Sequence, residues 1–372
     1  MQGEENPIYR ICLTGGPCAG KTTALNQLKD HLSQKGFKVF VVPEVPTLTM
    51  EGGGMIVMGG LSQEKICQFQ GLLMKAQMDL EDYFYNLAVL AGKPSVILYD
   101  RGVMDPKAYM DEPTWQAVLD LYNYNSVYLR DKRYQVVLHM VTAADGAEKF
   151  YTLENNAARY EDAPTARIVD KNLQNAWAGH PHHIFIDNSG DGFEAKIKNT
   201  IHAVEKYIGL ANAKSFQKKF TVKSVNIPSD QKYQTFDVEE SYVKPTDGAE
   251  NQYLRKRGTN GAYSYTFTQV FKNEDGTKRV VKSNITAKQY VKYGLSADEG
   301  YVILKKERIS FIYNGQSYIL DKFVDSKGKQ QHILKVETAS NDVKFEIPSW
   351  IQVGEDVSEN PEYSNSLLAR KQ

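Results

Sequence analysis

The first half of the chain alternates short apolar runs with longer segments in which apolar residues recur at helical spacing. The runs predict buried strands at residues 8–13, 37–42, 95–99, 134–141 and 183–186. The periodic segments predict helices at residues 22–34, 62–90, 164–178 and 192–208. For the second helix, Ser62 is the expected N-cap and Gly92 the expected stop. Strands that alternate with helices are typical of a parallel sheet with crossover helices, so we expect an α/β domain over residues 1–210.

From residue 216 the pattern changes to alternating apolar and polar positions, rich in Thr, Val, Tyr and Ile. Asn314-Gly315 lies between two such runs and predicts a two-residue β-hairpin. Two short helices are expected in this half, one of them near residues 286–293. The helix stop at Gly209 precedes the change of pattern. Residues 214–368 are therefore expected to form an α+β domain built on an antiparallel sheet or barrel.

Length and composition agree with two ordinary domains. The chain has 372 residues, of which 41% are hydrophobic. It shows no N-terminal apolar leader and no apolar stretch of 18 residues, so neither a signal peptide nor a transmembrane helix is expected. The three cysteines, Cys12, Cys18 and Cys67, follow no metal-binding or disulfide spacing, which favours a reducing, cytoplasmic compartment.

The most specific motif follows the first predicted strand. Residues 15–22 match the G-x-x-x-x-G-K-T phosphate-binding loop and precede a predicted helix. The glycines let backbone N–H groups curl around phosphates, and the helix directs its positive end at the anion. Lys21 is expected to reach the β and γ phosphates, and the Thr22 hydroxyl to bind Mg²⁺. The residues expected to bind the nucleotide are Gly15, Gly16, Pro17, Cys18, Ala19, Gly20, Lys21, Thr22 and Thr23.

Asp100 directly follows a predicted buried strand and is the candidate acidic partner of this loop. A carboxylate at the carboxyl end of a neighbouring parallel strand would lie beside the bound Mg²⁺ and hold its water shell. The next residues, Arg101 and Asp105, complete a string that resembles the DR motif of P-loop nucleoside and nucleotide kinases. In those kinases the Arg and a nearby Asp face the phosphoryl acceptor.

Glu44 ends the second predicted strand, beside a glycine-rich connection at residues 46–60. Such a connection could close over an acceptor, with Glu44 on the acceptor side. Equally, Glu44 could cap a helix or form a surface ion pair. Both readings remain open from the sequence.

Two arginines occupy the region where kinase lids deliver cations to the transferring phosphoryl group. Arg159 and Arg167 are these candidates, because a cation there stabilises charge on the γ-phosphate oxygens. Asp187 and Asn188 follow the fifth predicted strand and are expected under the purine ring. No Asn-Lys-x-Asp motif, which recognises guanine, occurs. The sequence therefore does not distinguish ATP from GTP as the nucleotide that binds together with Mg²⁺.

The two halves carry opposite charge. Residues 1–210 hold 20 Lys and Arg against 25 Asp and Glu, and the remainder hold 25 against 20. In the second half, period-two spacing places charges in pairs on one side of each predicted strand. Unpaired buried cations are unfavourable, so these pairs predict either a polar interior that binds a polyanion or a solvent-facing surface. The pairs are Arg255 and Arg257, Lys306 and Arg308, and Lys335 and Glu337.

The second half resembles the CYTH, or triphosphate tunnel metalloenzyme, superfamily. The resemblance lies in Leu254-Arg255-Lys256-Arg257, Lys306-Glu307-Arg308, Leu320-Asp321-Lys322-Phe323 and Ile347-Pro348-Ser349-Trp350. The first half is similar to the AAA-type P-loop domain of the nicotinamide riboside kinase part of NadR. Their fusion resembles the TRP-like channel translocation defect protein family, which is described as binding GTP and phosphoinositides in vesicular trafficking.

The tunnel motifs depart from those of the active superfamily. The opening Glu-x-Glu-x-Lys-Phe is replaced by Ser215-Phe216-Gln217-Lys218-Lys219-Phe220, and the later Glu-x-Glu by Lys335-Val336-Glu337. Loss of three anionic ligands weakens a hard-cation site and raises the local positive charge. We therefore expect triphosphatase activity to be lost and phosphorylated ligands to bind through Lys219, Arg255, Arg257, Lys306, Arg308, Lys335 and Glu337.

Three functions remain open from the sequence. The first, favoured by the resemblance, is a nucleotide-dependent trafficking adaptor that binds phosphoinositide head groups. It implies protein partners in trafficking or ciliary assemblies and peripheral contact with endomembranes. The second is a small-molecule, nucleoside-type kinase with an accessory tunnel domain. The third is a nucleotide-bearing structural component of a larger assembly. Nucleic acid is not expected as a partner, because no basic run is interleaved with aromatic residues.

Overall fold

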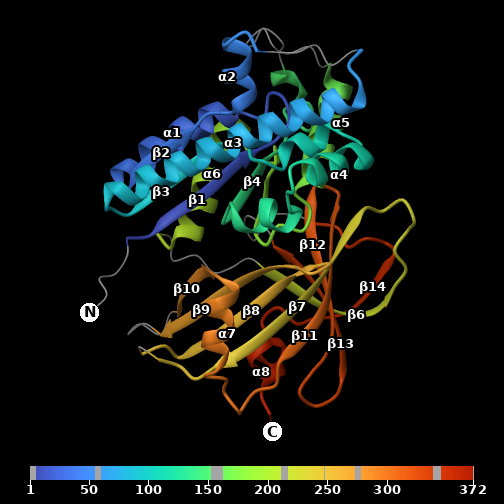
Figure 1. Cartoon of the computed structure of the whole chain (residues 1–372). Coiled ribbons are helices and arrows are strands. Elements are labelled where there is room, and N and C mark those ends of the chain that lie inside the picture. The colour runs from blue at the N-terminus through green and yellow to red at the C-terminus, as the bar shows by residue number, and fades with distance from the viewer. Residues whose placement is uncertain are drawn as a thin grey trace. The chain divides into compact units, whose positions relative to one another are not determined.

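The computed structural model describes residues 6–54, 60–151, 162–210, 217–246, 248–272, 278–337 and 345–371. The chain divides into two compact units, residues 1–213 and residues 214–372. Each unit has its own sheet (Figure 1). They are called unit 1 and unit 2 below.

Unit 1 contains a parallel sheet of five strands in the order β2-β3-β1-β4-β5. The carboxyl ends of all five strands therefore meet at one edge, where the connecting loops converge. The strands are β1 (Ile8–Thr14), β2 (Lys38–Val42), β3 (Ser95–Asp100), β4 (Val136–Met140) and β5 (His183–Ile186). The α-helices are α1 (Lys21–Gln34), α2 (Val45–Glu51), α3 (Gln63–Ala91), α4 (Glu112–Leu121), α5 (Ala163–Ala176) and α6 (Gly192–Ile208).

Helices cover both faces of this sheet (Figure 1). Cys12 of β1 packs in a core cluster with residues of α3 and α4, including Met74 and Trp115. Ile11 and Leu13 are also fully buried, and strand alternation directs their side chains to the other face. Burial on both faces explains why these strands read as continuous apolar runs in the sequence.

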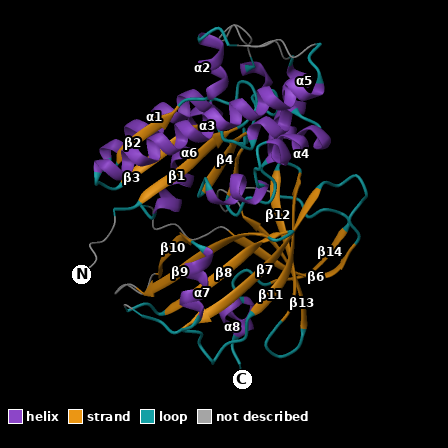
Figure 2. Cartoon of the chain, in the orientation of Figure 1, coloured by secondary structure: helices purple, strands orange, loops and turns teal. Residues whose placement is uncertain are grey.

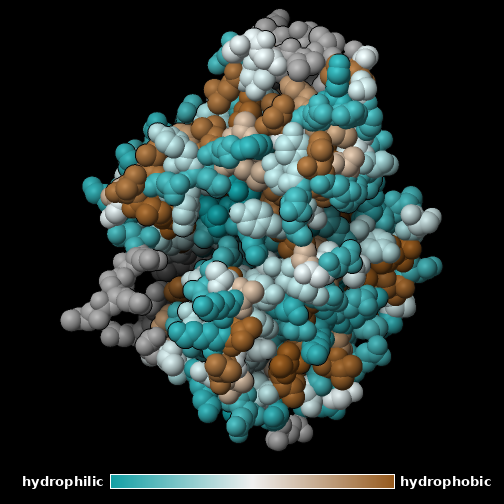
Figure 3. All heavy atoms as spheres, in the orientation of Figure 1, coloured by the Kyte–Doolittle hydropathy of each residue, from teal (hydrophilic) through white to brown (hydrophobic). Residues whose placement is uncertain are grey.

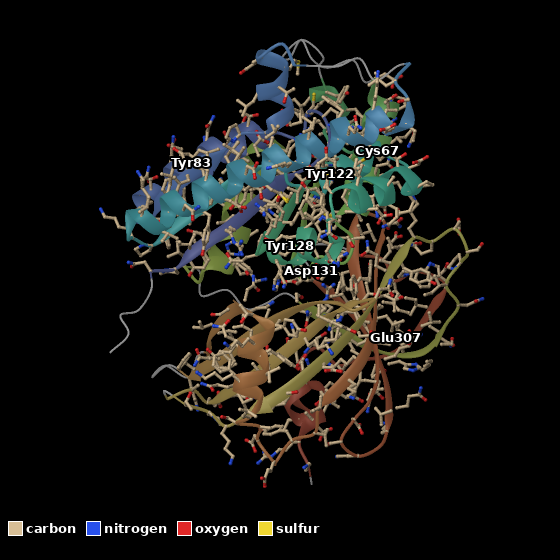
Figure 4. All side chains as sticks on the ribbon, in the orientation of Figure 1. Cys67, Tyr83, Tyr122, Tyr128, Asp131 and Glu307 are labelled. Atoms are coloured by element: carbon tan, nitrogen blue, oxygen red, sulfur yellow. The ribbon has the colours of Figure 1, made fainter. Side chains whose placement is uncertain are left out.

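The helix α3 begins and ends at the predicted caps. Ser62 accepts a hydrogen bond from the Lys65 N–H, and Gly92 adopts a left-handed φ of 59°. Its outer face exposes hydrophobic side chains such as Leu72 and Leu90. Its inner face meets α4, and the core cluster between them includes Cys67, with Tyr122 packed against it; both are labelled in Figure 4. Gly71 permits this approach, because a Cβ there would be 1.9 Å from the Tyr122 ring.

Two short helices were not predicted. The first, α2, occupies residues that the sequence suggested were a glycine-rich loop; it begins after Glu44, with Pro46 at its second position. Residues 55–59 of that connection lie outside the described residues. The second, α4, is capped by Asp111, whose carboxylate accepts from the Thr114 N–H. Among the helices of the described residues, none combines the length and apolar composition needed to span a bilayer.

Unit 2 contains an antiparallel sheet of nine strands in the order β10-β9-β8-β7-β11-β12-β13-β6-β14 (Figure 2). In the described residues the edge strands β10 and β14 do not pair, so the structure gives an extended sheet and not the closed barrel that was one expectation. The strands are β6 (Gln217–Val225), β7 (Tyr233–Val243), β8 (Asn251–Thr259), β9 (Ala262–Lys272), β10 (Lys278–Ile285), β11 (Leu304–Tyr313), β12 (Gln316–Val324), β13 (Gln330–Glu337) and β14 (Ile351–Asp356).

Local sequence signals in unit 2 are confirmed. Asn314 and Gly315 both have positive φ, 45° and 67°, as a type I′ turn between β11 and β12 requires. The helix α7 (Ala287–Gly294) follows a capping box formed by Thr286 and Gln289. A second short helix, α8 (Asn365–Ala369), lies near the carboxyl end.

Candidate functional site

The predicted nucleotide-binding residues lie at the carboxyl edge of the parallel sheet. The phosphate loop connects β1 to α1, and Asp100 ends the neighbouring strand β3. Around them lies a cavity of about 1300 Å³ within unit 1. Its walls include residues 17–23 of the loop, Glu44, Asp100, Arg101, Asp105 and Asn188.

The loop is held from below by contacts that its glycines make possible. A Cβ at Gly15 would lie 2.0 Å from the Met140 carbonyl oxygen, and one at Gly20 would lie 2.3 Å from the Phe193 ring. Both glycines have positive φ, 137° and 86°. The Gly16 N–H donates to Asp170 Oδ1 at 2.7 Å. Gly15 and Gly16 therefore form the packed base of the loop, whereas residues 17–23 face the cavity.

Lys21 lies over the loop at the first turn of α1. Its Nζ donates to the Gly15 and Gly16 carbonyl oxygens at 2.8 and 3.1 Å. Burial and the nearby charge of Arg101 lower the pKa of Lys21 to about 8. A triphosphate would add negative charge beside this ammonium and favour its protonated form.

Thr22 and Asp100 both line the cavity and fit a magnesium site of the kind that nucleotides complete. The described residues contain no cluster of three His, Cys, Asp or Glu side chains that could hold a metal alone. Mg²⁺ is usually held by one or two protein ligands together with waters and phosphate oxygens, which matches one hydroxyl and one carboxylate. Burial raises the pKa of Asp100, against the opposing charge of Lys21, and a bound divalent cation would counter that rise.

Glu44 and Arg101 form an ion pair on the cavity wall. Arg101 Nε donates to Glu44 Oε2 at 2.5 Å, and Thr47 donates to the other carboxylate oxygen. Burial raises the pKa of Glu44, but the Arg101 charge and the Thr47 hydrogen bond outweigh it, so the carboxyl is ionised at neutral pH. The ion pair with Arg101 and the N-cap position of α2 agree in part with the second interpretation of Glu44, although its side chain makes no capping hydrogen bond. Glu44 also lines the cavity, and its place on the acceptor side stays a prediction.

Arg101 is held in a strained backbone conformation. Its φ is 67°, in the left-handed region that residues other than glycine rarely adopt. The Arg101 N–H donates to the Leu13 carbonyl oxygen at 2.9 Å, which ties this turn to β1. In this conformation the Arg101 guanidinium pairs with Glu44 and Asp105.

Asp105 was predicted to face an acceptor, and it borders the cavity. Its side chain is nevertheless only 4% exposed and is occupied by donors from three elements. Thr14 Oγ1 donates to both oxygens at 2.8 and 2.9 Å, Trp177 Nε1 donates at 2.6 Å, and Arg101 Nη1 lies at 3.4 Å. These contacts hold Asp105 at the edge of the cavity, where it pairs with Arg101.

Of the two arginines predicted for the lid, the structure describes Arg167. Arg159 lies outside the described residues. Arg167 is exposed near the start of α5, where its Nη1 donates to the Ala144 carbonyl oxygen at 2.6 Å, and it is not part of the cavity wall. In this structure Arg167 therefore fastens α5 to the loop after β4.

The two residues predicted to lie under the purine ring, Asp187 and Asn188, differ in their positions relative to the cavity. Asn188 lines the cavity, and its amide donates to the carbonyl oxygens of Thr142 and Asp145 at 2.9 and 2.6 Å. Asp187 does not line the cavity, and its Oδ1 accepts from the Ser189 N–H and hydroxyl. Asn188 thus clamps the loops that follow β4 and β5.

Three residues of this site were missed from the sequence. Asp170 accepts from Gly16, His139 and Gln174 beneath the phosphate loop. Lys196 is 3% exposed, donates to Val141 and Asn188, and has its pKa lowered to about 8 by burial. Phe193 presents a 43% exposed ring to the cavity. All three lie on amphipathic helices, where they read as ordinary polar or boundary positions.

Unit 2 gathers its predicted ligand-binding residues on one face of the sheet. Direct cross-strand partners share a face, and the register aligns Lys219 with Lys335, Arg308 with Asp321, and Arg255 with Glu240. By alternation, Arg257, Lys306 and Glu337 lie on the same face. We call this set, with Glu240 and Asp321, the charged face.

Two buried carboxylates that the sequence did not reveal organise the charged face. Asp321 accepts two hydrogen bonds from Arg308, at 2.7 and 2.9 Å, and one from Lys335 at 2.8 Å. Glu240 accepts from Arg255 at 3.0 and 3.2 Å. Burial raises the pKa of Glu240, but Arg255, Lys306 and Lys335 outweigh it and lower the pKa to about 2. The face is thus an ion-pair network in which cations outnumber carboxylates.

The remaining members of the charged face differ in their contacts. Lys306 donates to Asn365 Oδ1 at 2.7 Å, and burial and Lys335 lower its pKa to about 7. Arg257 is 4% exposed, with its guanidinium carbon 3.9 Å from the Phe236 ring centre. Burial and Lys335 lower the pKa of Lys219. Glu337 accepts from Gln316 through its backbone carbonyl oxygen.

Comparison with known proteins adds one family match. Residues 10–195, half of the chain, match the family model described as AAA domain. Two solved structures are also similar to the chain. The hypothetical protein NE1496 is 28% identical, covers 42% of this chain and 97% of its own, and has a TM-score of 0.31. The inorganic triphosphatase NE1496 is 27% identical, covers 42% of this chain and 95% of its own, and has a TM-score of 0.30.

No curated protein sequence matches the chain. The family match spans the phosphate loop, the Asp100 strand end and the loops after β4 and β5, all of which border the cavity. The chain therefore belongs to the AAA domain family, and its unit 1 is a nucleotide-binding P-loop domain.

Proposed function

We propose that unit 1 binds a magnesium–nucleoside triphosphate and transfers its γ-phosphoryl group to a second small molecule in the same cavity. One observation carries the proposal: a single cavity joins the phosphate loop to the Glu44–Arg101 pair and continues along α2 and α3. A protein that only binds and hydrolyses a nucleotide needs no cavity that extends beyond the γ-phosphate.

The residues of the cavity supply the parts that phosphoryl transfer needs. Lys21 and the loop N–H groups would hold the β and γ phosphates, and Thr22 and Asp100 would hold Mg²⁺, which screens their charge. Arg101 would lie where charge develops on the transferred group. Glu44, ionised and 27% exposed, would accept a proton from an acceptor hydroxyl.

Nucleotide binding is tested by Lys21→Ala. We expect the affinity of the full chain for MgATP or MgGTP to fall about 10–100-fold, since a charge-assisted hydrogen bond contributes about 1.5–3 kcal/mol. Titration calorimetry measures this change and shows which base is preferred. Lys29→Ala, which removes an exposed lysine of the same helix, is the control and should leave the affinity unchanged. Equal affinity of wild type and Lys21→Ala would contradict the proposal.

We propose a second function for unit 2, in which the charged face binds a phosphorylated ligand such as a phosphoinositide head group. Supporting this is the excess of cations among the described residues of the charged face: Arg255, Lys306, Arg308 and Lys335 pair with the two buried carboxylates Glu240 and Asp321. With the resemblance to the TRP-like channel translocation defect family, this function would make the protein a nucleotide-dependent adaptor in trafficking, working at endomembrane surfaces from the cytoplasm.

The second function predicts a pH dependence that Lys306 controls. Lys306 has a pKa of about 7, so its ammonium is mostly protonated at pH 6 and mostly neutral at pH 8. If binding needs the ammonium, affinity for inositol 1,4,5-trisphosphate should fall about tenfold over that range. Comparison with Lys306→Met isolates the pH dependence that comes from Lys306, because the charge of the ligand changes with pH in the same way for both proteins. The exposed neighbour variant Lys305→Met should behave as wild type, and a constant ratio of wild-type to Lys306→Met affinity would contradict the role of Lys306.

A further inference from the structure

The cavity has an apolar wall on the side away from the nucleotide loops. One stripe of α3 lines it, with residues spaced as successive turns of one helical face: Ile66, Phe69, Gln70, Leu73, Met74 and Gln77. The short helix α2 adds Val45, Pro46 and Met50. Hydrophobic side chains gather in Figure 3 where α2 stands over α3. Glu44 precedes α2, so this wall begins at the Glu44–Arg101 pair.

No described residue of this apolar wall carries a positive charge. Among the described residues, the cations that line the cavity are Lys21, Arg101, Lys149 and Lys196. Lys149 and Lys196 follow β4 and β5, at the nucleotide end. The Arg101 guanidinium is already paired with Glu44 and Asp105. An anionic group placed against α3 would lose its hydration without gaining a positively charged partner among the described residues, which is strongly unfavourable.

One polar group on the wall is available to a ligand. The Gln70 side chain forms no hydrogen bond with any other residue that the structure describes. Gln77, two turns further along, is occupied, since its amide contacts the Val45 N–H at 3.3 Å and Glu81 at 3.1 Å. Binding pockets combine apolar walls with a few polar groups that fix orientation, and Gln70 fits that role.

The size of the cavity allows two ligands. Its volume of about 1300 Å³ exceeds the range of about 300–1,000 Å³ that is usual for one small-molecule pocket. A nucleotide held by residues 17–23 would occupy the end near Phe193 and Asn188. The α2–α3 end would then remain for a second molecule next to the γ-phosphate.

We propose that the second molecule is an uncharged alcohol with an apolar chain or ring body, and not a phosphorylated acceptor. This inference rests on the phosphoryl-transfer function proposed for unit 1. The alcohol oxygen forms a bond to the γ-phosphorus while the bond from that phosphorus to the β–γ bridging oxygen breaks. The hydroxyl proton passes to the Glu44 carboxylate and then to water. The products are a phosphate monoester, a nucleoside diphosphate and one proton.

The test measures diphosphate release and monoester formation by the full chain with MgATP or MgGTP. The probes are three alcohols with their monophosphates: geraniol, thymidine and glycerol. We expect geraniol or thymidine to raise diphosphate release at least tenfold over the rate without acceptor. Their monophosphates, glycerol and glycerol 3-phosphate should not do so. A rate raised by a monophosphate, or by glycerol alone, would show transfer to a different acceptor class and overturn the inference.

Variants on one helix separate the inference from the proposed function. Leu73→Lys places a charge on the apolar wall and should reduce alcohol stimulation at least tenfold. Leu72→Lys places the same charge on the outer face of α3, where Leu72 is 58% exposed, and should keep the stimulation. Gln70→Leu should weaken the response to thymidine more than the response to geraniol. If nucleotide binds in a Lys21-dependent manner but no alcohol stimulates, nucleotide binding stands and the alcohol acceptor is refuted.

Discussion

Asp321→Asn should destabilise unit 2 by about 3–5 kcal/mol, the range observed when one partner of a buried ion pair is removed. The Asp321 side chain is fully buried and accepts hydrogen bonds from Arg308 and Lys335, with Lys306 at 3.9 Å. Burial opposes its ionisation, but these three cations hold the pKa of Asp321 well below its usual value. The neutral amide would remove the carboxylate that Arg308 and Lys335 contact and leave the three cations with less counter-charge. Hydrogen exchange of the β11 and β12 amides in the full chain measures the loss.

The matched control is Asp237→Asn on β7, which lies two strands from β12 in the same sheet. Asp237 is exposed, so the same chemical change should alter stability by no more than about 0.5 kcal/mol. Equal exchange rates for Asp321→Asn and wild type would mean that the charged face is hydrated enough to screen its cations. That result would also weaken the second function, because a face already screened by water gains little from a phosphorylated ligand.

This network illustrates what the sequence could and could not predict for unit 2. Alternation alone placed Arg255 with Arg257 and Lys306 with Arg308, because side chains two apart on a strand share a face. It could not show that Glu240 and Asp321 neutralise part of that charge. Those contacts depend on strand register: Glu240 pairs with Arg255 across β7 and β8, and Asp321 pairs with Arg308 across β11 and β12. The two pairs come together on one face only because β7 and β11, which are distant in the sequence, are neighbours in the sheet.

In unit 1 the local signals predicted the elements well. The strands β1 and β3 and the helices α1, α3 and α6 follow from apolar runs, helical spacing and the glycines that end two of the helices. The helix α2 was missed because it is only seven residues long and leads into a glycine-rich stretch. Short helices are stabilised mainly by tertiary contacts, and α2 packs on α3.

The roles of individual residues in unit 1 were harder to predict than their positions. From the sequence, Asp105 resembles a reactive acid five residues after the end of β3, yet Trp177, from far along the chain, donates a hydrogen bond to its buried side chain. Asp170 gave no sequence signal, although it supports the phosphate loop from α5. Both contacts join residues more than seventy positions apart, so no local pattern could reveal them.

Gly15→Ala should abolish nucleotide binding, with affinity for MgATP or MgGTP lower by more than about 100-fold, or about 3 kcal/mol. The new Cβ would lie 2.0 Å from the Met140 carbonyl oxygen and 2.9 Å from its carbon. Met140 cannot move away easily, because β4 is paired on both sides, with β1 and β5. Relief must then come from the phosphate loop, whose N–H groups would leave the positions that hold phosphate. Titration calorimetry on the full chain measures the effect.

Gly36→Ala separates this clash from general strain. Gly36 also has a positive φ, 91°, but a Cβ there would meet nothing within 4 Å. It should therefore lower the stability of unit 1 by about 1–2 kcal/mol, the usual strain of a left-handed residue, without changing nucleotide affinity. If Gly15→Ala binds nucleotide as tightly as Gly36→Ala does, the loop can shift without losing its phosphate contacts. The close packing of the loop on β4 would then not be what shapes the site.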